Sequence, residues 1–328
     1  MTVISIDSGS LDVIAEWAAT GHITDATTNP LFVSQAGLSG DPLYAAMVDE
    51  AVDYAKARAS GDEAVALSMD RLAVNLGLQI SKLVTGYVST EVDVRLSYNV
   101  EESLTCARRI IAMYEEAGVE RSRILIKLAG TWEGLLCAML LEREGITCNI
   151  TLVFSFIQAV TAGQFGIRLI SPFPGRVLDW HKSRGAGPEW APHEDPGVVL
   201  CARTIRYYNK YGHSTICMPA SWRPSRGPSS PEYALDEIVA LAGSDRMTIP
   251  ANLLERLAAS EEPLPRVLEP AAGASSCMDD EICGGMVTEE MFKFAMEMDG
   301  CGPDKLAEGI AAFVADTEKL EAAIRSKF

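Results

Sequence analysis

The sequence has no excess of positive charge and no long apolar run. Its 328 residues include 45 acidic and 28 basic side chains, which give a formal net charge of −17 and an isoelectric point near 4.7. This balance argues against a nucleic-acid-binding surface, and an anionic substrate would require a local basic pocket. No apolar stretch is long enough to span a membrane, and the first seven residues lack the basic segment of a signal peptide. We therefore expect a soluble, cytoplasmic protein with neither nucleic-acid nor membrane partners.

Motifs that bind metals or nucleotides are also absent. The cysteines form no C-x-x-C pair, the four histidines form no H-E-x-x-H pattern, and Gly284-Gly285 is not followed by Lys and Ser or Thr. These absences argue against zinc catalysis and against a Ser-His-Asp triad, so we expect neither a metal nor a cofactor. We expect reduced, partly buried thiols for the eight cysteines, which are Cys106, Cys137, Cys148, Cys201, Cys217, Cys277, Cys283 and Cys301.

Short β-like runs alternate with helical patterns over most of the chain. Strand–helix alternation predicts a parallel sheet, and eight repeats favour a closed (β/α)8 barrel, here a single domain over residues 1–328. A doubly wound open sheet is the alternative, although no G-x-G-x-x-G follows the first strand. The expected strands are residues 3–7, 23–29, 86–93, 124–129, 148–154, 168–173, 214–221 and 246–251. The expected helices include residues 11–19, 100–117, 132–144, 156–162 and 198–211.

Four segments exceed a minimal barrel. Residues 30–83 have room for about two long helices where one would serve, and residues 286–328 are expected to form C-terminal helices that pack on the barrel. Residues 183–197 and 223–231 are rich in Pro, Gly and Ser. We expect both of these loops to follow strands and therefore to lie at the C-terminal rim of the barrel, where active sites form.

Lys127 is the one charged residue in the apolar run of residues 124–129, which reads as a buried strand. A buried ammonium is costly unless it is paired or neutralised, and desolvation favours the neutral amine. A neutral amine is a nucleophile that can form a Schiff base with a carbonyl. The alternative is that Lys127 lies at a strand end and extends its amine to water.

Other polar residues cluster at the ends of the expected strands. Side chains at the C-terminal ends of barrel strands converge on one pocket, so these residues are candidates for a common site. Each also has a simpler interpretation: Asp7 as a helix cap, Asn29 with Pro30 as a turn, Glu91 as a solvated acid, Arg176 as the partner of Asp179, and Arg223 as a loop cation. The candidates are Asp7, Thr27, Asn29, Glu91, Lys127, Asn149, Thr151, Ser171, Arg176, Ser221 and Arg223.

Five segments that contain most of these candidates resemble segments of the transaldolase family. They are residues 25–30 (Asp-Ala-Thr-Thr-Asn-Pro), 89–93 (Ser-Thr-Glu-Val-Asp), 123–129 (Arg-Ile-Leu-Ile-Lys-Leu-Ala), 148–152 (Cys-Asn-Ile-Thr-Leu), and 171–180 from Ser-Pro-Phe to Leu-Asp-Trp. The resemblance covers essentially the whole chain, including residues 195–198, 241–246 and 305–310. It is similar to the classical subfamily rather than to the shorter fructose-6-phosphate-aldolase-like one. The resemblance implies a class I aldolase on a (β/α)8 barrel that needs no metal.

The resemblance also implies a role for each candidate. Lys127 matches the Schiff-base lysine, Asp7 the acid that exchanges a proton with the C4 hydroxyl, and Glu91 with Thr151 the pair that positions a water. Thr27, Asn29, Asn149, Ser171 and Phe173 match substrate-binding positions, and Arg176, Ser221 and Arg223 match the phosphate site.

The implied reaction transfers a dihydroxyacetone unit from sedoheptulose 7-phosphate to glyceraldehyde 3-phosphate, as in the pentose phosphate pathway, by a homodimer. Two alternatives stay open: a paralogue with the same chemistry on another sugar, and a non-catalytic sugar-phosphate-binding barrel. The sequence departs from the family pattern at Gly130, Pro174, Trp222 and residues 224–231. These departures lie around the phosphate end, so they bear on substrate preference more than on the lysine chemistry.

Overall fold

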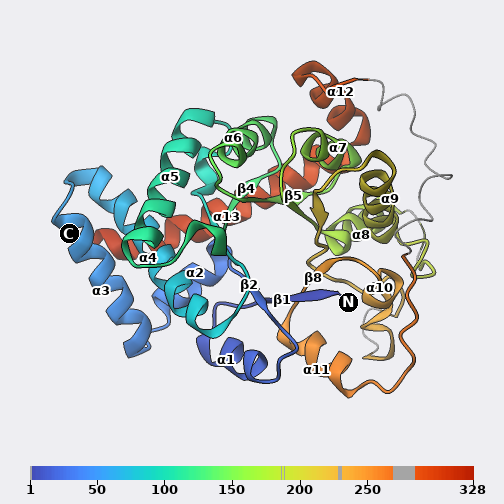
Figure 1. Cartoon of the computed structure of the whole chain (residues 1–328), viewed down its shortest axis with the longest axis horizontal. Coiled ribbons are helices and arrows are strands. Elements are labelled where there is room, and N and C mark those ends of the chain that lie inside the picture. The colour runs from blue at the N-terminus through green and yellow to red at the C-terminus, as the bar shows by residue number, and fades with distance from the viewer. Residues whose placement is uncertain (1, 186, 188, 228–230, 269–284) are drawn as a thin grey trace.

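The computed structural model describes residues 2–185, 187, 189–227, 231–268 and 285–328. Within them, eight parallel strands form one sheet in the order β7-β6-β5-β4-β3-β2-β1-β8. Helices surround the strands on the outside (Figure 1). The strands are β1 (Val3–Asp7), β2 (Asp25–Thr27), β3 (Val88–Glu91), β4 (Ile124–Ala129), β5 (Cys148–Val153), β6 (Leu169–Pro172), β7 (Ile216–Cys217) and β8 (Arg246–Ile249).

The sheet closes on itself between its two end strands. The backbone N–H of Thr248 in β8 donates to the carbonyl of Pro219, just beyond β7, at 2.9 Å. All six residues of β4 and of β5 are buried, as expected for strands covered on both faces. The predicted (β/α)8 barrel is confirmed, and the open doubly wound sheet is wrong.

The helices begin where the sequence provides caps. Ser10, Asn29, Asp41, Asn99 and Thr131 each accept a backbone N–H at the first turn of the helix that follows. The helices are α1 (Leu11–Ala19), α2 (Pro30–Leu38), α3 (Pro42–Lys56), α4 (Gly61–Leu83), α5 (Val100–Glu116), α6 (Trp132–Arg143), α7 (Phe156–Gln164), α8 (Pro174–Ser183), α9 (Pro196–Tyr211), α10 (Asp236–Ala240), α11 (Ala251–Ala259), α12 (Glu289–Asp299) and α13 (Cys301–Arg325). Short 3-10 turns lie at Val94–Leu96, Arg121–Arg123 and Pro231–Tyr233.

Residues 30–83 contain the two long helices predicted there, α3 with 15 residues and α4 with 23, preceded by the shorter α2 with 9 residues. The first break lies at Gly40, whose φ of +73° favours glycine, followed by the cap Asp41 and by Pro42 at the first helical position. The second break precedes Gly61, the first residue of α4.

The loop at residues 183–197 does not follow a strand, contrary to expectation. It begins at the end of α8, because β6 is followed by two helices, α8 and α9, each with a proline at its start. The loop still reaches the segment after β7, since Ser225 Oγ donates to the carbonyl of Trp190 at 3.2 Å. The segment at residues 223–231 does follow β7, as predicted, although residues 228–230 lie outside the described part.

The C-terminal segment is helical in α12 and α13, as predicted. Helix α13 runs across the barrel and ends near α3 (Figure 1). It contacts α2, α4, α8 and β5, and Gly309 lies against the side chain of Leu152. At its end, Lys56 of α3 donates to the carbonyl of Lys327 at 2.6 Å.

The described residues contain no helix long and apolar enough to cross a membrane. Six of the cysteines are buried free thiols, and Cys277 and Cys283 lie outside the described residues.

Candidate active site

A cavity of about 230 Å³ opens at the C-terminal ends of the strands; we call it the mouth cavity. Nine of the twelve predicted site residues line it. They are far apart in the sequence, from Asp7 at the end of β1 to Arg223 after β7. These nine are Asp7, Thr27, Asn29, Lys127, Ser171, Phe173, Arg176, Ser221 and Arg223. Of the other three, Glu91 and Asn149 are register partners of Lys127, and Thr151 lies two residues beyond Asn149 in β5.

Lys127 points inward from the middle of β4. Its residue is 4% exposed, its Nζ lies 3.2 Å from Oε2 of Glu91, and it donates to the carbonyl of Thr28 at 3.1 Å. The alternative that it extends to bulk water at a strand end is therefore wrong. A buried amine held between a carboxylate and a carbonyl oxygen has a fixed direction, and it faces the floor of the mouth cavity.

Glu91 is the carboxylate partner of this amine. Its side chain is 5% exposed, and neither carboxylate oxygen has an aligned hydrogen-bond partner among the described residues, so the contact with Lys127 is an ion pair only. Burial raises the pKa of Glu91, and the nearby Lys127 opposes the rise. A carboxyl group whose pKa is raised by burial and lowered by a neighbouring lysine can take a proton from that lysine and return it.

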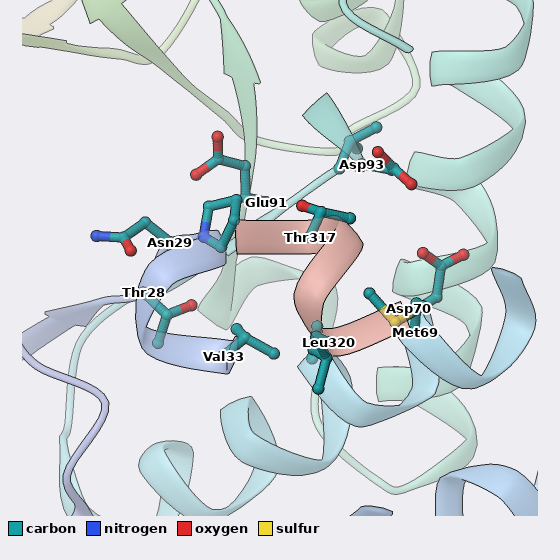
Figure 2. Close-up of a pocket in the computed structure, with 12 residues that line it drawn as sticks. Thr28, Asn29, Val33, Met69, Asp70, Glu91, Asp93, Thr317 and Leu320 are labelled. Carbon is teal, nitrogen blue, oxygen red and sulfur yellow. The ribbon is translucent and has the colours of Figure 1, made fainter. Parts of the chain in front are cut away.

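A second, smaller cavity of about 50 Å³ lies on the far side of Glu91 (Figure 2). Figure 2 shows Glu91 and Asn29 at one side of it, Asp70 and Asp93 at the other, and Thr317 of α13 between them. Asn29 lines both cavities. Asn29 thus forms part of the wall between the two cavities.

Asp7 ends β1 and faces the same cavity. Desolvation raises its pKa from an ordinary 3.8 to about 6, while Lys127 and Arg176 lower it by their positive charge. The N-cap of α1 is Ser10, so the interpretation of Asp7 as a helix cap is wrong. A carboxyl group that titrates near pH 6 can act as both acid and base close to neutral pH.

Asn149 connects three strands across the barrel floor. Its Nδ2 donates to Ser89 Oγ at 3.3 Å, and its Oδ1 accepts from Ser171 Oγ at 2.8 Å. Thr151 lies two residues further along β5 and is fully buried, and its Oγ1 has no hydrogen-bond partner among the described residues. The register places Asn149 beside Lys127 and Thr151 beside Ala129.

Asn29 is the N-cap of α2, and its Oδ1 accepts from the N–H of Phe32 at 3.1 Å. The interpretation of Asn29-Pro30 as a simple turn is therefore wrong. The cap holds the amide of Asn29 at the cavity wall beside Thr27, the last residue of β2.

Two arginines form the basic end of the cavity. The Arg176 guanidinium lies 5.2 Å from the centre of the Phe173 ring, and burial together with the positive Arg223 lowers the pKa of Arg176. Asp179 lies 3.5 Å from Nε of Arg223, so the predicted alternative of an Arg176–Asp179 ion pair is wrong. Two guanidinium groups at one end of a cavity suit bidentate binding of a phosphate.

A close backbone contact brings these arginines together. Gly175, in the first turn of α8, donates its N–H to the carbonyl of Ser221 at 3.1 Å. A Cβ at this position would lie 2.4 Å from the same oxygen and 2.7 Å from the backbone nitrogen of Arg223. Ser221 has a φ of +61°, which costs energy for a residue with a side chain and is typical of a functional site.

The predicted site did not include seven other residues that line the mouth cavity: Leu31, Phe32, Ala220, Trp222, Thr248, Pro250 and Phe313. Of these we consider Thr248 of β8 and Phe313 of α13. Thr248 alternates with the apolar Met247 and Ile249, and this alternation was the available signal. Nothing in the local sequence indicates that Phe313 reaches the barrel mouth. Among the described residues, no group of three or more His, Cys, Asp or Glu side chains could hold a metal ion.

The fold and the site define a (β/α)8-barrel protein with a buried, carboxylate-paired lysine and an arginine pair in one cavity. A family model described as Transaldolase/Fructose-6-phosphate aldolase matches residues 4–324. The chain belongs to this family. It is 45% identical to a transaldolase of Glaesserella parasuis serovar 5 (strain SH0165), over 100% of this chain and 97% of the relative. It is also 44% identical to transaldolases of Actinobacillus succinogenes and Haemophilus influenzae (strain 86-028NP), over 100% of this chain and 96% of each relative.

Proposed function

We propose that this protein is a transaldolase, an enzyme of the transferase class, and that Lys127 carries the transferred unit as a Schiff base. The substrates would be sugar phosphates: a dihydroxyacetone unit moves from sedoheptulose 7-phosphate to glyceraldehyde 3-phosphate, giving erythrose 4-phosphate and fructose 6-phosphate. The observation that carries this proposal is the buried Lys127, 3.2 Å from Glu91, in the same cavity as Asp7 and two arginines.

The first step is imine formation. Glu91 takes a proton from Lys127, and the neutral amine attacks the C2 ketone of the donor. The carbinolamine then loses its hydroxyl as water, with the proton supplied by the Glu91 carboxyl group. The oxygens of Glu91 and Thr151, buried and without hydrogen-bond partners among the described residues, are suited to hold this water until hydrolysis reverses the step.

The second step is cleavage of the C3–C4 bond. Asp7 accepts the C4 hydroxyl proton, the C4 oxygen forms the aldehyde, and the bonding electrons move through the imine to nitrogen. The resulting enamine stays on Lys127 while the aldehyde leaves. The acceptor aldehyde then enters, C3 attacks its carbonyl carbon, and Asp7 returns the proton to the new hydroxyl.

The remaining candidates bind the sugar. Asn149 with Ser171, and Asn29 with Thr27, surround the place where the dihydroxyacetone hydroxyls would lie. Ser221 and the two arginines would bind the phosphate, and Phe173 shapes the pocket beneath Arg176. The local basic pocket that an acidic chain needs for an anionic substrate is supplied by these arginines.

A paralogue with another sugar as its substrate is the second candidate. It is favoured by the loop after Arg223, whose residues 224–231 depart from the family pattern next to the phosphate end. Comparison of turnover on phosphorylated and unphosphorylated ketoses separates the two functions. We further propose that the chain acts as one domain, as a cytoplasmic homodimer; gel filtration with light scattering tests the dimer.

Trapping with borohydride tests the lysine chemistry. Sodium borohydride added with fructose 6-phosphate reduces the imine, and the expected product is a covalent adduct at Lys127 found by peptide mass spectrometry. Lys127→Met should give neither adduct nor turnover. Lys305→Met is the matched control, because Lys305 is also buried, is paired with Glu308, and does not line the mouth cavity. An adduct at another lysine, or turnover by Lys127→Met, contradicts the proposal.

A further inference from the structure

Thr248 places a hydroxyl at the mouth cavity that the proposed mechanism does not use. The residue is 2% exposed and lines the cavity, and its Oγ1 is buried without a hydrogen-bond partner among the described residues. Its backbone is fixed on both sides: the N–H donates to Pro219, and the carbonyl accepts from the indole Nε1 of Trp222 at 2.7 Å. The backbone position from which the Thr248 side chain extends into the cavity is therefore fixed.

A buried hydroxyl without a partner is unfavourable, so each one in a native structure requires an explanation. Other described side chains share this property, including Thr151, Thr204 and Thr215, but Thr248 alone among them lines the mouth cavity. A hydroxyl of the bound substrate would provide the missing partner. Thr248 is thus a candidate for direct contact with substrate.

The position of β8 in the barrel indicates which part of the substrate is near. β8 pairs with β1, whose last residue is Asp7, and lies next to the segment after β7 that carries Ser221 and Arg223. In the proposed mechanism the C4 hydroxyl is at Asp7 and the phosphate is at the arginines. Two carbons of fructose 6-phosphate, C5 and C6, lie between these two points and therefore over β8, and only C5 carries a free hydroxyl, which comes from the acceptor aldehyde.

We propose that the Thr248 hydroxyl hydrogen-bonds the hydroxyl next to the carbonyl of the acceptor, and that it selects α-hydroxyaldehyde phosphates over aldehydes that lack this group. The inference rests on the proposed transaldolase function and adds a specificity-determining contact to it. A site that hydrogen-bonds a substrate hydroxyl discriminates against an analogue without it, because its own polar group is then left unpaired.

The test compares two acceptors with one enzyme. Glyceraldehyde 3-phosphate carries the hydroxyl, and 3-hydroxypropanal phosphate has the same chain length with a methylene in its place. The unchanged enzyme should have the higher kcat/KM with glyceraldehyde 3-phosphate. In Thr248→Val, which keeps the shape but loses the hydroxyl, kcat/KM for glyceraldehyde 3-phosphate should fall about 3- to 10-fold, the range for one neutral hydrogen bond, while the value for the deoxy acceptor stays unchanged.

Two further variants make the result specific. Thr248→Ser keeps the hydroxyl and should keep the preference. Thr215→Val removes an equally buried, unpartnered hydroxyl that does not line the mouth cavity, and it should leave both acceptors unaffected. Equal losses with both acceptors in Thr248→Val overturn the inference, because they indicate a structural role for the hydroxyl.

The unchanged enzyme alone can also decide the question if Thr248→Val does not fold. If the unchanged enzyme had equal kcat/KM values for the two acceptors, the proposed hydrogen bond from Thr248 would be contradicted without any variant. Failure of the proposed function itself looks different, since the unchanged enzyme would then transfer no dihydroxyacetone unit to either acceptor.

Discussion

Two buried carboxyl groups have separate tasks in the proposed mechanism: Glu91 exchanges a proton with Lys127, and Asp7 exchanges one with the C4 hydroxyl of the substrate. Glu91 is in ion-pair contact with Lys127, and Asp7 faces the cavity that the same amine reaches. Burial is the largest influence on both, and it raises both pKa values above the ordinary range. Desolvation therefore prepares one acid for the imine steps and the other for the cleavage step, with neither task assigned to histidine or metal.

Replacing Asp7 by Asn should stabilise the protein at neutral pH. The folded-state pKa of Asp7, about 6, lies above its ordinary 3.8, so protonated Asp7 contributes stability that is complete below pH 3.8 and is lost as the pH rises through about 6. At pH 8 the ionised group costs about 1–3 kcal/mol, which Asp7→Asn should recover. Urea unfolding of both proteins at pH 8 and pH 5 measures this, and the gain should be smaller at pH 5.

The same variant should lose C3–C4 cleavage while still forming the imine, because Asn cannot accept the C4 hydroxyl proton. Borohydride should therefore still trap donor on Lys127 in Asp7→Asn. In the unchanged enzyme, cleavage should decline as the pH falls through about 6. An equal gain in stability at both pH values would show that Asp7 is not desolvated in the folded protein.

Helix α8 is the element that assembles the basic end of the cavity. It carries Arg176 into the mouth, places Asp179 3.5 Å from Arg223, and presents Gly175 to the backbone of the β7 segment. All three positions fall within its first two turns. The distance between the two arginines is thus set by how closely α8 approaches Ser221.

Gly175→Ala should weaken phosphate binding. The added Cβ would lie 2.4 Å from the Ser221 carbonyl, which is backbone and cannot rotate away, so α8 and the β7 segment must separate. The expected result is a KM for fructose 6-phosphate raised about 10-fold or more, since a misplacement of this size is costly in a positioned site. Steady-state kinetics with fructose 6-phosphate and with unphosphorylated fructose as donors measures it, and the effect should be confined to the phosphorylated one.

Gly285→Ala is the control, because a Cβ at Gly285 would meet nothing within 4 Å and the backbone there is not left-handed. If Gly175→Ala raised KM equally for both donors, the arginine spacing would not depend on this contact.

The elements most accessible to prediction from sequence were those with strong local signals. β1 and β4 have the predicted bounds, and Lys127 is conspicuous because a charge interrupts an apolar run. β2 and β7 are shorter than predicted, because the β2 sequence continues through Thr28 into the helix cap Asn29, and the residues after Cys217 leave the ladder. Helix α8 does have a local start signal, because Pro174 lies in its first turn.

Contacts between distant residues were beyond local sequence reasoning. Nothing near Asp179 indicates that its partner is Arg223 rather than Arg176, because the choice depends on how α8 docks on the β7 segment. Phe313 likewise reaches the cavity only because α13 crosses the barrel. The family resemblance supplied most of the remaining site, and Thr248 lay outside the motifs that carried it.

At the scale of the whole molecule, the site depends on closure of the ring. Its residues run from Asp7 in β1 to Phe313 in α13, and they share one cavity only because β8 meets both β1 and the β7 segment. Two hydrogen bonds to the Thr248 backbone join β8 to that segment: one from its N–H to Pro219, and one to its carbonyl from the Trp222 indole. The second joins the side chain next to Arg223 to the closing strand, so barrel closure and the phosphate end are coupled.

Trp222→Phe, which keeps an aromatic ring but removes the indole N–H, should therefore weaken the contact between β8 and the segment after β7. Trp222 is 7% exposed, and its removal leaves the buried Thr248 carbonyl without its indole partner, at a cost of about 1–3 kcal/mol. Urea unfolding measures the loss, and amide hydrogen exchange at Thr248 should speed up as the strand opens locally. Trp180→Phe is the matched control: its indole donates to Asp304 at the surface, so it should cost no more than about 0.5 kcal/mol. Equal losses in the two variants would mean that the Trp222 bond does not hold the barrel closed.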